Sequence, residues 1–305
     1  MQRILVIFPG ALGDLVCVGP ALAVIRKSHG DAEIELMARE ELARLAVGRM
    51  GIARGHSIDR PELAALFSDD AGCIERARGF FGQFAHIHSF FAFENSQFRK
   101  NMIELSAPAI ATFYRFRPEG AGHVSDAYVE EVAGSMVPVA TRFELLAEDV
   151  ASAQHATADV RRFVVIFPGS GSAKKNWGTE RFIALANSIY ERHVEPVFVL
   201  GPAEIAIESR LRASGYRVIK DIPLGTVAAI ARVADAFIGV DSGVSHLAAA
   251  AGARGIVLFG PTDPRRWAPL GAAVAVIHRE PMDRIEPAEV AVLIDEIVAE
   301  KNASR

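Results

Sequence analysis

One segment occurs twice in the sequence, and this repeat limits the possible folds more than any other feature. RILVIFPG at residues 3–10 returns as RFVVIFPG at residues 162–169. Each copy is a short apolar run closed by Pro-Gly, which is typical of a buried strand that ends in a tight turn. Chance is one explanation, because apolar strands that end in Pro-Gly are common. We favour the other explanation, that the two halves are similar domains joined in tandem.

Apolar runs and amphipathic stretches alternate along both halves. Strands are expected at residues 3–8, 33–37, 85–91, 109–113, 162–167, 196–200, 216–219, 236–240, 255–259 and 274–277. Helices are expected at residues 15–28, 40–49, 98–106, 125–137, 179–192, 203–213, 224–233, 244–251 and 287–299. Such alternation predicts the α/β class, with two doubly wound parallel sheets in domains that face each other across a cleft.

The bulk properties set the limits of the chain's architecture and partners. Its 305 residues suffice for two domains, and we place the boundary in the small, polar stretch at 151–159, giving domains at 1–150 and 151–305. The net charge of −4 argues against a nucleic-acid partner. Cys17 and Cys73 form no ligand cluster and are expected to be free thiols in a reducing compartment. No apolar run is long enough to predict a transmembrane helix.

The stretch at residues 236–264 collects polar residues where a buried strand ends and a helix begins. Asp241, Ser242 and Gly243 form the turn, and His246 follows one helical turn later. The carboxyl edge of a parallel sheet is where ligands bind, and a helix N-terminus suits a phosphate. The alternative is an ordinary helix cap with a satisfied histidine, since Ser and Asp are common at helix starts. From this stretch alone the two interpretations are equally good.

Two further turns in the second half contain residues suited to a nucleotide. FPGSGSAKKNW at 167–177 lacks the spacing of a P-loop, but its N–H groups, Ser170 and Lys175 are able to hold an anion. The alternative is a solvated loop with surface lysines. Glu204, after the strand at 196–200, sits where ribose hydroxyls lie in nucleotide-binding domains. It is also simply an acidic residue in a first helical turn, where the helix dipole favours it.

In the first half, Asp14 follows the first strand and is a candidate general base or a helix cap. The segment from Arg76 to Arg117 is basic and holds ten of the chain's 24 aromatic residues. We favour core packing for most of its phenylalanines, with contact to anionic lipid as the alternative. His86 and His88 alternate on a predicted strand and share a face, but no third metal ligand is evident from the sequence.

These residues together resemble glycosyltransferase family 9, the ADP-heptose:lipopolysaccharide heptosyltransferases. The resemblance spans nearly the whole chain and is strongest in the second half. Its most specific part is GVDSGVSHL at 239–247, followed by LFGPTDP at 258–264. Supporting pieces are LGD at 12–14, PGSG at 168–171, KNW at 175–177 and GPAE at 201–204.

The resemblance implies a GT-B fold of two Rossmann-like domains. It implies an inverting enzyme that moves heptose or a similar sugar from an ADP-activated donor to a lipopolysaccharide core or another lipid-linked glycan. The N-terminal domain would bind the acceptor and the C-terminal domain the nucleotide sugar, without a metal ion or cofactor. The enzyme is expected in the cytoplasm, with peripheral contact at the anionic inner face of the inner membrane.

The resemblance also implies roles for individual residues. Asp14 would be the base that deprotonates the acceptor hydroxyl, and Arg60 would contact the acceptor. The residues implied in donor binding are Ser170, Lys175, Glu204, Asp241, Ser242, Gly243 and His246.

The first turn departs from the family pattern. The family often carries a basic or polar residue and Ser or Thr residues where this chain has Phe8, Pro9, Gly10 and Ala11. The acceptor is therefore less defined than the donor. Two rival functions remain: a nucleotide-sugar epimerase or hydrolase on the same fold, and a non-catalytic nucleotide-sugar-binding protein.

Overall fold

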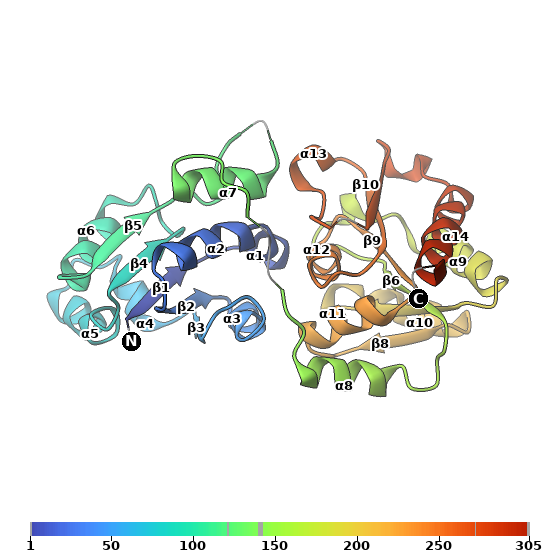
Figure 1. Cartoon of the computed structure of the whole chain (residues 1–305), viewed down its shortest axis with the longest axis horizontal. Coiled ribbons are helices and arrows are strands. Elements are labelled where there is room, and N and C mark those ends of the chain that lie inside the picture. The colour runs from blue at the N-terminus through green and yellow to red at the C-terminus, as the bar shows by residue number, and fades with distance from the viewer. Residues whose placement is uncertain (1, 121, 140–142, 272, 304–305) are drawn as a thin grey trace. The chain divides into compact units, whose positions relative to one another are not determined.

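The computed structural model describes residues 2–120, 122–139, 143–271 and 273–303, which fold as two compact units (Figure 1). Unit 1 is Met1–Glu144 and unit 2 is Leu145–Arg305. The small, polar stretch chosen as the domain boundary is mostly helical: α8 (Ala147–Ala156) belongs to unit 2, where its Ala153 is fully buried in the core. In the described part of the chain, we find no helix with the length and hydropathy needed to cross a bilayer.

Unit 1 is built on a five-stranded parallel sheet with the strand order β3-β2-β1-β4-β5. The strands are β1 (Arg3–Ile7), β2 (Glu33–Ala38), β3 (Arg54–Ser57), β4 (His86–Ser89) and β5 (Ile110–Phe113). The helices are α1 (Leu12–Cys17), α2 (Gly19–Ser28), α3 (Glu40–Ala46), α4 (Pro61–Ala65), α5 (Ala71–Phe81), α6 (Ser96–Ser106) and α7 (Val124–Ala133).

Side chains alternate between the two faces of the unit 1 sheet, and both faces are covered. Leu5, Ile7 and Ile87 point to one face and pack into an apolar cluster with α4, α5 and α6. The opposite face lies beneath α2 and α7, which pack against each other (Figure 1). His86 and His88 point to this second face, because they alternate with Ile87 on β4.

Unit 2 is built on a six-stranded parallel sheet with the strand order β11-β10-β9-β6-β7-β8. The strands are β6 (Phe163–Phe167), β7 (Glu195–Leu200), β8 (Arg217–Lys220), β9 (Ala236–Val240), β10 (Gly255–Phe259) and β11 (Val274–His278). Besides α8, the helices are α9 (Thr179–Tyr190), α10 (Ile205–Ala213), α11 (Leu224–Val233), α12 (Gly243–Ala250), α13 (Pro264–Trp267) and α14 (Pro287–Ala303). Three short 3-10 helices are η1 (Ala173–Lys175), η2 (Pro202–Glu204) and η3 (Met282–Arg284).

The core of unit 2 has two layers, one on each face of the sheet. Val164, Ile166 and Ile238 join a cluster formed with α9, α10 and α14. Val165 and Phe237 face the other way, toward α8, α11 and α12. The central strands are therefore apolar on both faces, as in parallel sheets covered by helices on each side.

The sequence repeat corresponds to the same topological position in both sheets. β1 lies between β2 and β4, and β6 lies between β7 and β9. In each unit the chain builds outward from this strand on one side and then crosses to the other side. The point where the strand order reverses lies between β1 and β4 in unit 1 and between β6 and β9 in unit 2. At such a switch point the loops at the carboxyl edge diverge and leave room for a ligand.

Several expected boundaries were wrong. The helix expected at 15–28 is two helices, α1 and α2, because Pro20 stands at the start of the second. The helix expected at 125–137 is α7, which begins at Val124 and ends at Ala133, and its N-cap residue is His123, whose side chain accepts the Ser125 N–H. Residues 51–81 hold β3, α4 and α5, which the weak apolar pattern there did not predict.

Candidate functional site

Asp14 lies in the first turn of α1, just beyond the carboxyl end of β1, rather than in the preceding turn as expected. It is 4% exposed, and its Oδ2 accepts the N–H of the helix N-cap residue Ala11 at 3.0 Å. A carboxylate here is favoured by the unpaired N–H groups of the helix start. Asp14 is therefore not the N-cap residue, which is Ala11, but its carboxylate does satisfy the N–H of that residue.

Arg117 holds the same carboxylate from the other side. Its Nε donates to Asp14 Oδ1 and its Nη2 to Asp14 Oδ2, both at 2.8 Å. Arg117 has a φ of +53°, and its backbone N–H donates to the Tyr128 hydroxyl at 3.1 Å. The hydrogen bonds that Arg117 donates to Asp14 are the main cause of its raised pKa. This bidentate pair fixes the orientation of Asp14. In the sequence, the only indication of the Asp14–Arg117 pair was the presence of basic residues after the strand expected at 109–113.

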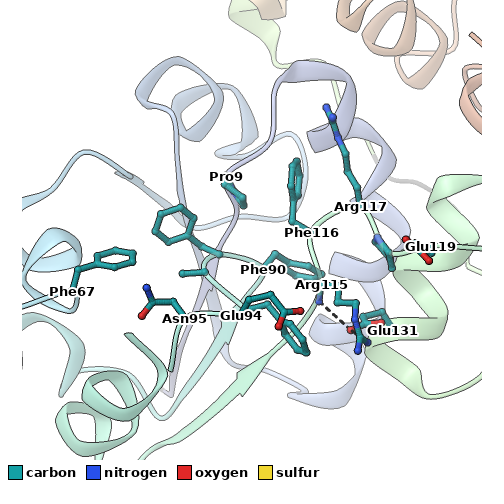
Figure 2. Close-up of a pocket in the computed structure, with 14 residues that line it drawn as sticks. Pro9, Phe67, Phe90, Glu94, Asn95, Arg115, Phe116, Arg117, Glu119 and Glu131 are labelled. Carbon is teal, nitrogen blue, oxygen red and sulfur yellow. Dashed lines mark hydrogen bonds and ion pairs between the residues drawn. The ribbon is translucent and has the colours of Figure 1, made fainter. Parts of the chain in front are cut away.

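An open pocket of about 1090 Å³ lies at the carboxyl edge of the unit 1 sheet. Most of its wall comes from the segments that follow β1, β4 and β5, and Phe67 and Glu131 come from after α4 and from α7. Figure 2 shows Phe67 on one side and Arg115, Arg117 and Glu119 on the opposite side. Arg115 is held there by Glu131, whose Oε1 accepts the Arg115 backbone N–H at 3.0 Å. The lining residues are Pro9, Phe67, Phe90, Phe91, Ala92, Phe93, Glu94, Asn95, Arg115, Phe116, Arg117, Pro118, Glu119 and Glu131.

The basic, aromatic segment 76–117 is divided between core and pocket. Phe80, Phe81 and Phe84 are buried in the unit 1 core, as we expected for most of these phenylalanines. Phe91 and Phe93 are only half-buried and line the pocket. The sequence did not predict this pocket, because composition alone does not distinguish a phenylalanine in the core from one in a pocket wall.

The unusual first turn packs inward. Phe8 is fully buried and makes edge-on contacts with Phe90, Phe116 and Tyr128 at centroid distances of 5.6 to 6.0 Å. A Cβ at Gly10 would lie 2.4 Å from the Phe8 ring and 2.6 Å from the Asp14 Cβ. The turn therefore packs against the aromatic wall of the pocket and brings α1 close behind it.

Arg60 is engaged elsewhere in unit 1. It donates to both oxygens of Glu62, at 2.6 and 3.2 Å, and its guanidinium lies 4.3 Å from the Phe80 ring centroid. The hydrogen bond from Arg60 lowers the pKa of Glu62. Arg60 is not among the residues that line the pocket, so the structure does not bring this predicted acceptor contact to Asp14.

In unit 2, Lys175 and Asp241 meet at the switch point of the sheet. Lys175 ends η1 in the loop after β6, and Asp241 directly follows β9, the neighbouring strand. Lys175 Nζ lies 2.7 Å from Asp241 Oδ2, an ion pair without the angular geometry of a hydrogen bond. The Asp241 side chain is 7% exposed and that of Lys175 is 33% exposed. The pair thus presents its cation to solvent.

The loop that carries Lys175 is fixed at both ends. The Ser170 hydroxyl contacts Ser172 O at 2.7 Å and Asn176 Oδ1 at 2.9 Å. Trp177 is buried against Phe182, and its indole N–H donates to Ile285 O at 3.0 Å. Ser170 therefore organises the loop, and Trp177 anchors the backbone beside Lys175.

Glu204 closes the next turn along the sheet, after β7. Its Oε2 accepts the Gly201 N–H at 2.8 Å. Its Oε1 lies over Gly169, where a Cβ would come within 2.0 Å of that oxygen. Glu204 is half-buried, and its carboxylate lies against the turn that leads to Lys175.

α12 begins directly after Asp241. Ser242 is its N-cap residue, but the Ser242 side chain makes no capping hydrogen bond and instead lies 3.2 Å from Ser245 Oγ. Gly243 is the first helical residue. His246 is buried one turn later, and its backbone N–H donates to Ser242 O at 3.3 Å. The Ser242 side chain therefore does not cap the first N–H groups of α12. These N–H groups follow Asp241 of the Lys175–Asp241 pair in the chain.

The model of glycosyltransferase family 9 (heptosyltransferase) matches residues 132–286, which is half of the chain. The chain belongs to glycosyltransferase family 9. The match covers most of unit 2, which in this family 9 protein carries all of the predicted donor residues. A search of curated proteins gives no match.

Solved structures share the fold over nearly the whole chain. The glycosyl transferase family 9 from Veillonella parvula DSM 2008 is 19% identical, with a TM-score of 0.82 over 98% of each chain. E. coli ADP-heptose lps heptosyltransferase II is 15% identical, with a TM-score of 0.81 over 99% of this chain and 100% of that one. E. coli heptosyltransferase WaaC with ADP is 18% identical, with a TM-score of 0.69 over 97% and 100%. The two parallel-sheet units of this family 9 protein are thus those of the GT-B fold.

Proposed function

We propose that this family 9 protein is an inverting glycosyltransferase that moves heptose or a similar sugar from an ADP-activated donor to a lipopolysaccharide core or another lipid-linked glycan. Family membership supports the transferase activity. The names of two solved structures with this fold, an ADP-heptose lps heptosyltransferase II and a heptosyltransferase with ADP, support the donor. The observation that carries the proposal is the Lys175–Asp241 pair at the unit 2 switch point, beside the start of α12.

Unit 2 offers the groups that a nucleotide diphosphate requires. Lys175 and the N–H groups at Gly243 supply positive charge for the diphosphate. Asp241 is suited to hold sugar hydroxyls once Lys175 turns to the phosphate. Glu204 is suited to the ribose, because it accepts hydrogen bonds at the edge of the same sheet. We propose that Ser170 orders the loop that binds the phosphates. We propose that Ser242 and His246 form part of the helix start that faces the diphosphate.

In unit 1, we propose Asp14 as the general base that accepts the proton of the attacking hydroxyl. A base must be held in a fixed direction, and the carboxylate is bound by Arg117 and by the Ala11 N–H. The step forms a bond between the acceptor oxygen and the anomeric carbon and breaks the bond to the diphosphate. One displacement inverts the anomeric centre and needs only one carboxylate, in contrast to the two of most glycoside hydrolases.

The diphosphate leaves with its negative charge, and we propose that protein groups alone stabilise that charge. A lysine and the N-terminus of a helix are preorganised donors of the kind that stabilises charge developing in a transition state. On this proposal, neither a metal ion nor a cofactor takes part in the transfer.

The open pocket beside Asp14 is suited to the acceptor. Aromatic side chains such as Phe91 and Phe116 provide faces for sugar rings, and Arg115 and Arg117 provide charge for phosphate or carboxylate groups on a glycan core. We infer an acceptor carried by a lipid at the inner face of the cytoplasmic membrane, with peripheral contact to anionic headgroups. Arg60 would take part only at a part of the acceptor that lies away from this pocket.

The proposal is tested first by a thermal-shift panel of nucleotide sugars. At about 100 times its dissociation constant the true donor adds about 2.7 kcal/mol of stability. We expect a shift with ADP-sugars, whereas a shift with UDP- or GDP-sugars alone would contradict the ADP donor. Incubation with donor alone then separates the rivals: turnover without acceptor indicates an epimerase or hydrolase. Tight binding without transfer to any lipid-linked glycan indicates a binding protein.

A further inference from the structure

Three histidines meet on one face of the unit 1 sheet, beneath α2. His86 and His88 come from β4 and stack with their ring centroids 4.2 Å apart and their planes 5° from parallel. His29 directly follows α2, and its ring lies edge-on to both, at 5.0 Å from each centroid. One ring nitrogen from each histidine lies within 4.8 Å of the other two. The third ligand that the sequence did not reveal is thus supplied by the end of a helix.

One ring nitrogen of His88 and one of His86 have hydroxyl partners on β5 or just after it. His88 Nδ1 lies 2.9 Å from the Tyr114 hydroxyl, and His86 Nε2 lies 2.8 Å from Thr112 Oγ1. Thr112 is paired with His88 in the sheet register, so these groups share one face. When His88 Nδ1–H and His86 Nε2–H donate to these hydroxyls, the other ring nitrogen of each histidine keeps its lone pair. Metal-binding histidines are normally oriented by such outer hydrogen bonds.

The surroundings favour uncharged imidazole, which is the form that binds metal. Burial, together with the neighbouring His86 and His29, lowers the pKa of His88 to about 3. Burial also lowers the pKa of His29 and of His86. Burial thus disfavours the charged form of all three rings.

The present arrangement is close to that of a metal site but is not identical to one. His29 Nε2 and His88 Nε2 are 2.8 Å apart, so one of them carries a hydrogen that bonds to the other. Ligands of a tetrahedral zinc ion at 2.0–2.1 Å lie roughly 3.4 Å from one another. An ion would therefore replace the shared hydrogen, with the His29 proton moving to Nδ1. His29 is able to make this adjustment, because it is half-buried at the free end of α2 and is followed by Gly30 with a φ of +57°.

We propose that His29, His86 and His88 bind a divalent transition-metal ion of the zinc class. Three imidazoles are a known protein ligand set for zinc, and imidazole suits such ions better than calcium or magnesium. The site ties the end of α2 to β4. None of the three histidines is among the residues that line the pocket beside Asp14, so we assign the ion a structural role rather than one in the transfer.

The test measures zinc binding by the full-length chain after treatment with a chelator. Zn²⁺ is titrated in competition with a chromogenic chelator, and Co²⁺ is added separately as a probe with a visible spectrum. The variants are His29→Ala and His86→Ala, and the matched control is His155→Ala, which removes an exposed histidine from α8. Circular dichroism of the metal-free variants establishes that they are folded.

We expect one Zn²⁺ per chain, at least a tenfold loss of affinity in His29→Ala and in His86→Ala, and unchanged affinity in His155→Ala. Co²⁺ should give a visible absorption band that disappears in the two site variants. Zn²⁺ should also raise the melting temperature of the wild type by several degrees but not that of His29→Ala. If His86→Ala fails to fold, His29→Ala alone decides. Absence of stoichiometric binding, or equal binding by His29→Ala and the wild type, would overturn the proposal.

Discussion

The carboxyl edges of the two sheets start from nearly the same sequence but end with different chemistry. In both units the first strand ends in Pro-Gly beside the switch point, and an acidic residue pairs there with a basic one. In unit 1 the acid, Asp14, follows the first strand, and its partner Arg117 comes after β5. In unit 2 the basic residue, Lys175, follows the first strand, and its acidic partner Asp241 comes after β9. The residue that follows the first strand is thus acidic in unit 1 and basic in unit 2, so the positions of the two charges are exchanged.

The contrast extends to what surrounds each pair. Phe8 turns inward and joins an aromatic wall, so the unit 1 edge is an open pocket with apolar and basic sides. In unit 2 the corresponding glycine, Gly169, lies beneath the Glu204 carboxylate, so that edge is polar. The topology thus sets where a ligand binds, and the few residues after each glycine set which ligand it is. Four predictions test this comparison.

The largest effect is expected at Asp14. Asp14→Asn keeps an oxygen for the Ala11 N–H but removes the base, so the transfer rate should fall by about 10²–10⁴-fold. Binding of the nucleotide sugar should be unchanged, because the proposed donor residues are all in unit 2. The rate is measured under donor saturation and the affinity by calorimetry. An equal loss of donor affinity would mean that Asp14 supports the fold rather than the chemistry.

The next effect is expected at Lys175. Lys175→Ala removes the cation proposed to bind the diphosphate, and the dissociation constant of the donor should rise by about 10–100-fold, since bonds to charged groups are worth about 1.5–3 kcal/mol. Lys174→Ala is the matched control, because Lys174 is the exposed neighbour on the same 3-10 helix. Similar affinities for the two variants would remove Lys175 from the donor site.

The two equivalent glycines should respond differently to alanine. At Gly10 the new Cβ meets the fully buried Phe8 ring, and overpacking should lower the free energy of unfolding by about 1–3 kcal/mol. At Gly169 it meets the end of the flexible Glu204 side chain, so stability should change little while donor affinity falls. Denaturant unfolding and donor titration of both variants provide the comparison. Equal losses of stability would show that the two turns are equally rigid.

The smallest effect is expected at Ser242. Its side chain makes no capping bond, so Ser242→Ala should change the free energy of unfolding by less than about 0.5 kcal/mol. Asn95→Ala is the control, because Asn95 Oδ1 does cap α6 by accepting the Phe98 N–H at 2.8 Å, and its loss should cost about 1 kcal/mol. A larger loss at Ser242 than at Asn95 would mean that α12 depends on its serine without a ligand.

Much of the fold was predictable, because its information is local. The apolar runs at residues 163–167 and 236–240 are strands that are buried on both faces, and hydrophobic patterning identifies such strands directly. The exposed first residues of β3, at Arg54 and Gly55, have no such pattern, and the strand was missed. The division into units was harder to locate because α8 is made of small and polar residues and is buried mainly through Ala153.

The candidate sites were predictable only where one short segment carries them. Asp241, Ser242 and Gly243 are contiguous, and their position at a strand end could be inferred without a structure. The pairing of Asp14 with Arg117 joins residues 103 positions apart, and the contact of His29 with His88 joins residues 59 positions apart. No spacing rule applies to such pairs, because only the register of the sheet brings them together. The roles assigned to these residues stay predictions until the substitutions are made.

Among the described residues, those that line the pocket beside Asp14 lie between Pro9 and Glu131, outside the 132–286 range that matches the family model. Selection can therefore alter the loops after β4 and β5 without changing the turns that hold Lys175 and Asp241. If the proposed acceptor and donor sites are correct, a duplicated gene would be free to acquire a new acceptor while keeping its nucleotide sugar. On the same proposal, a small molecule fitted to this pocket would not compete with adenine nucleotides.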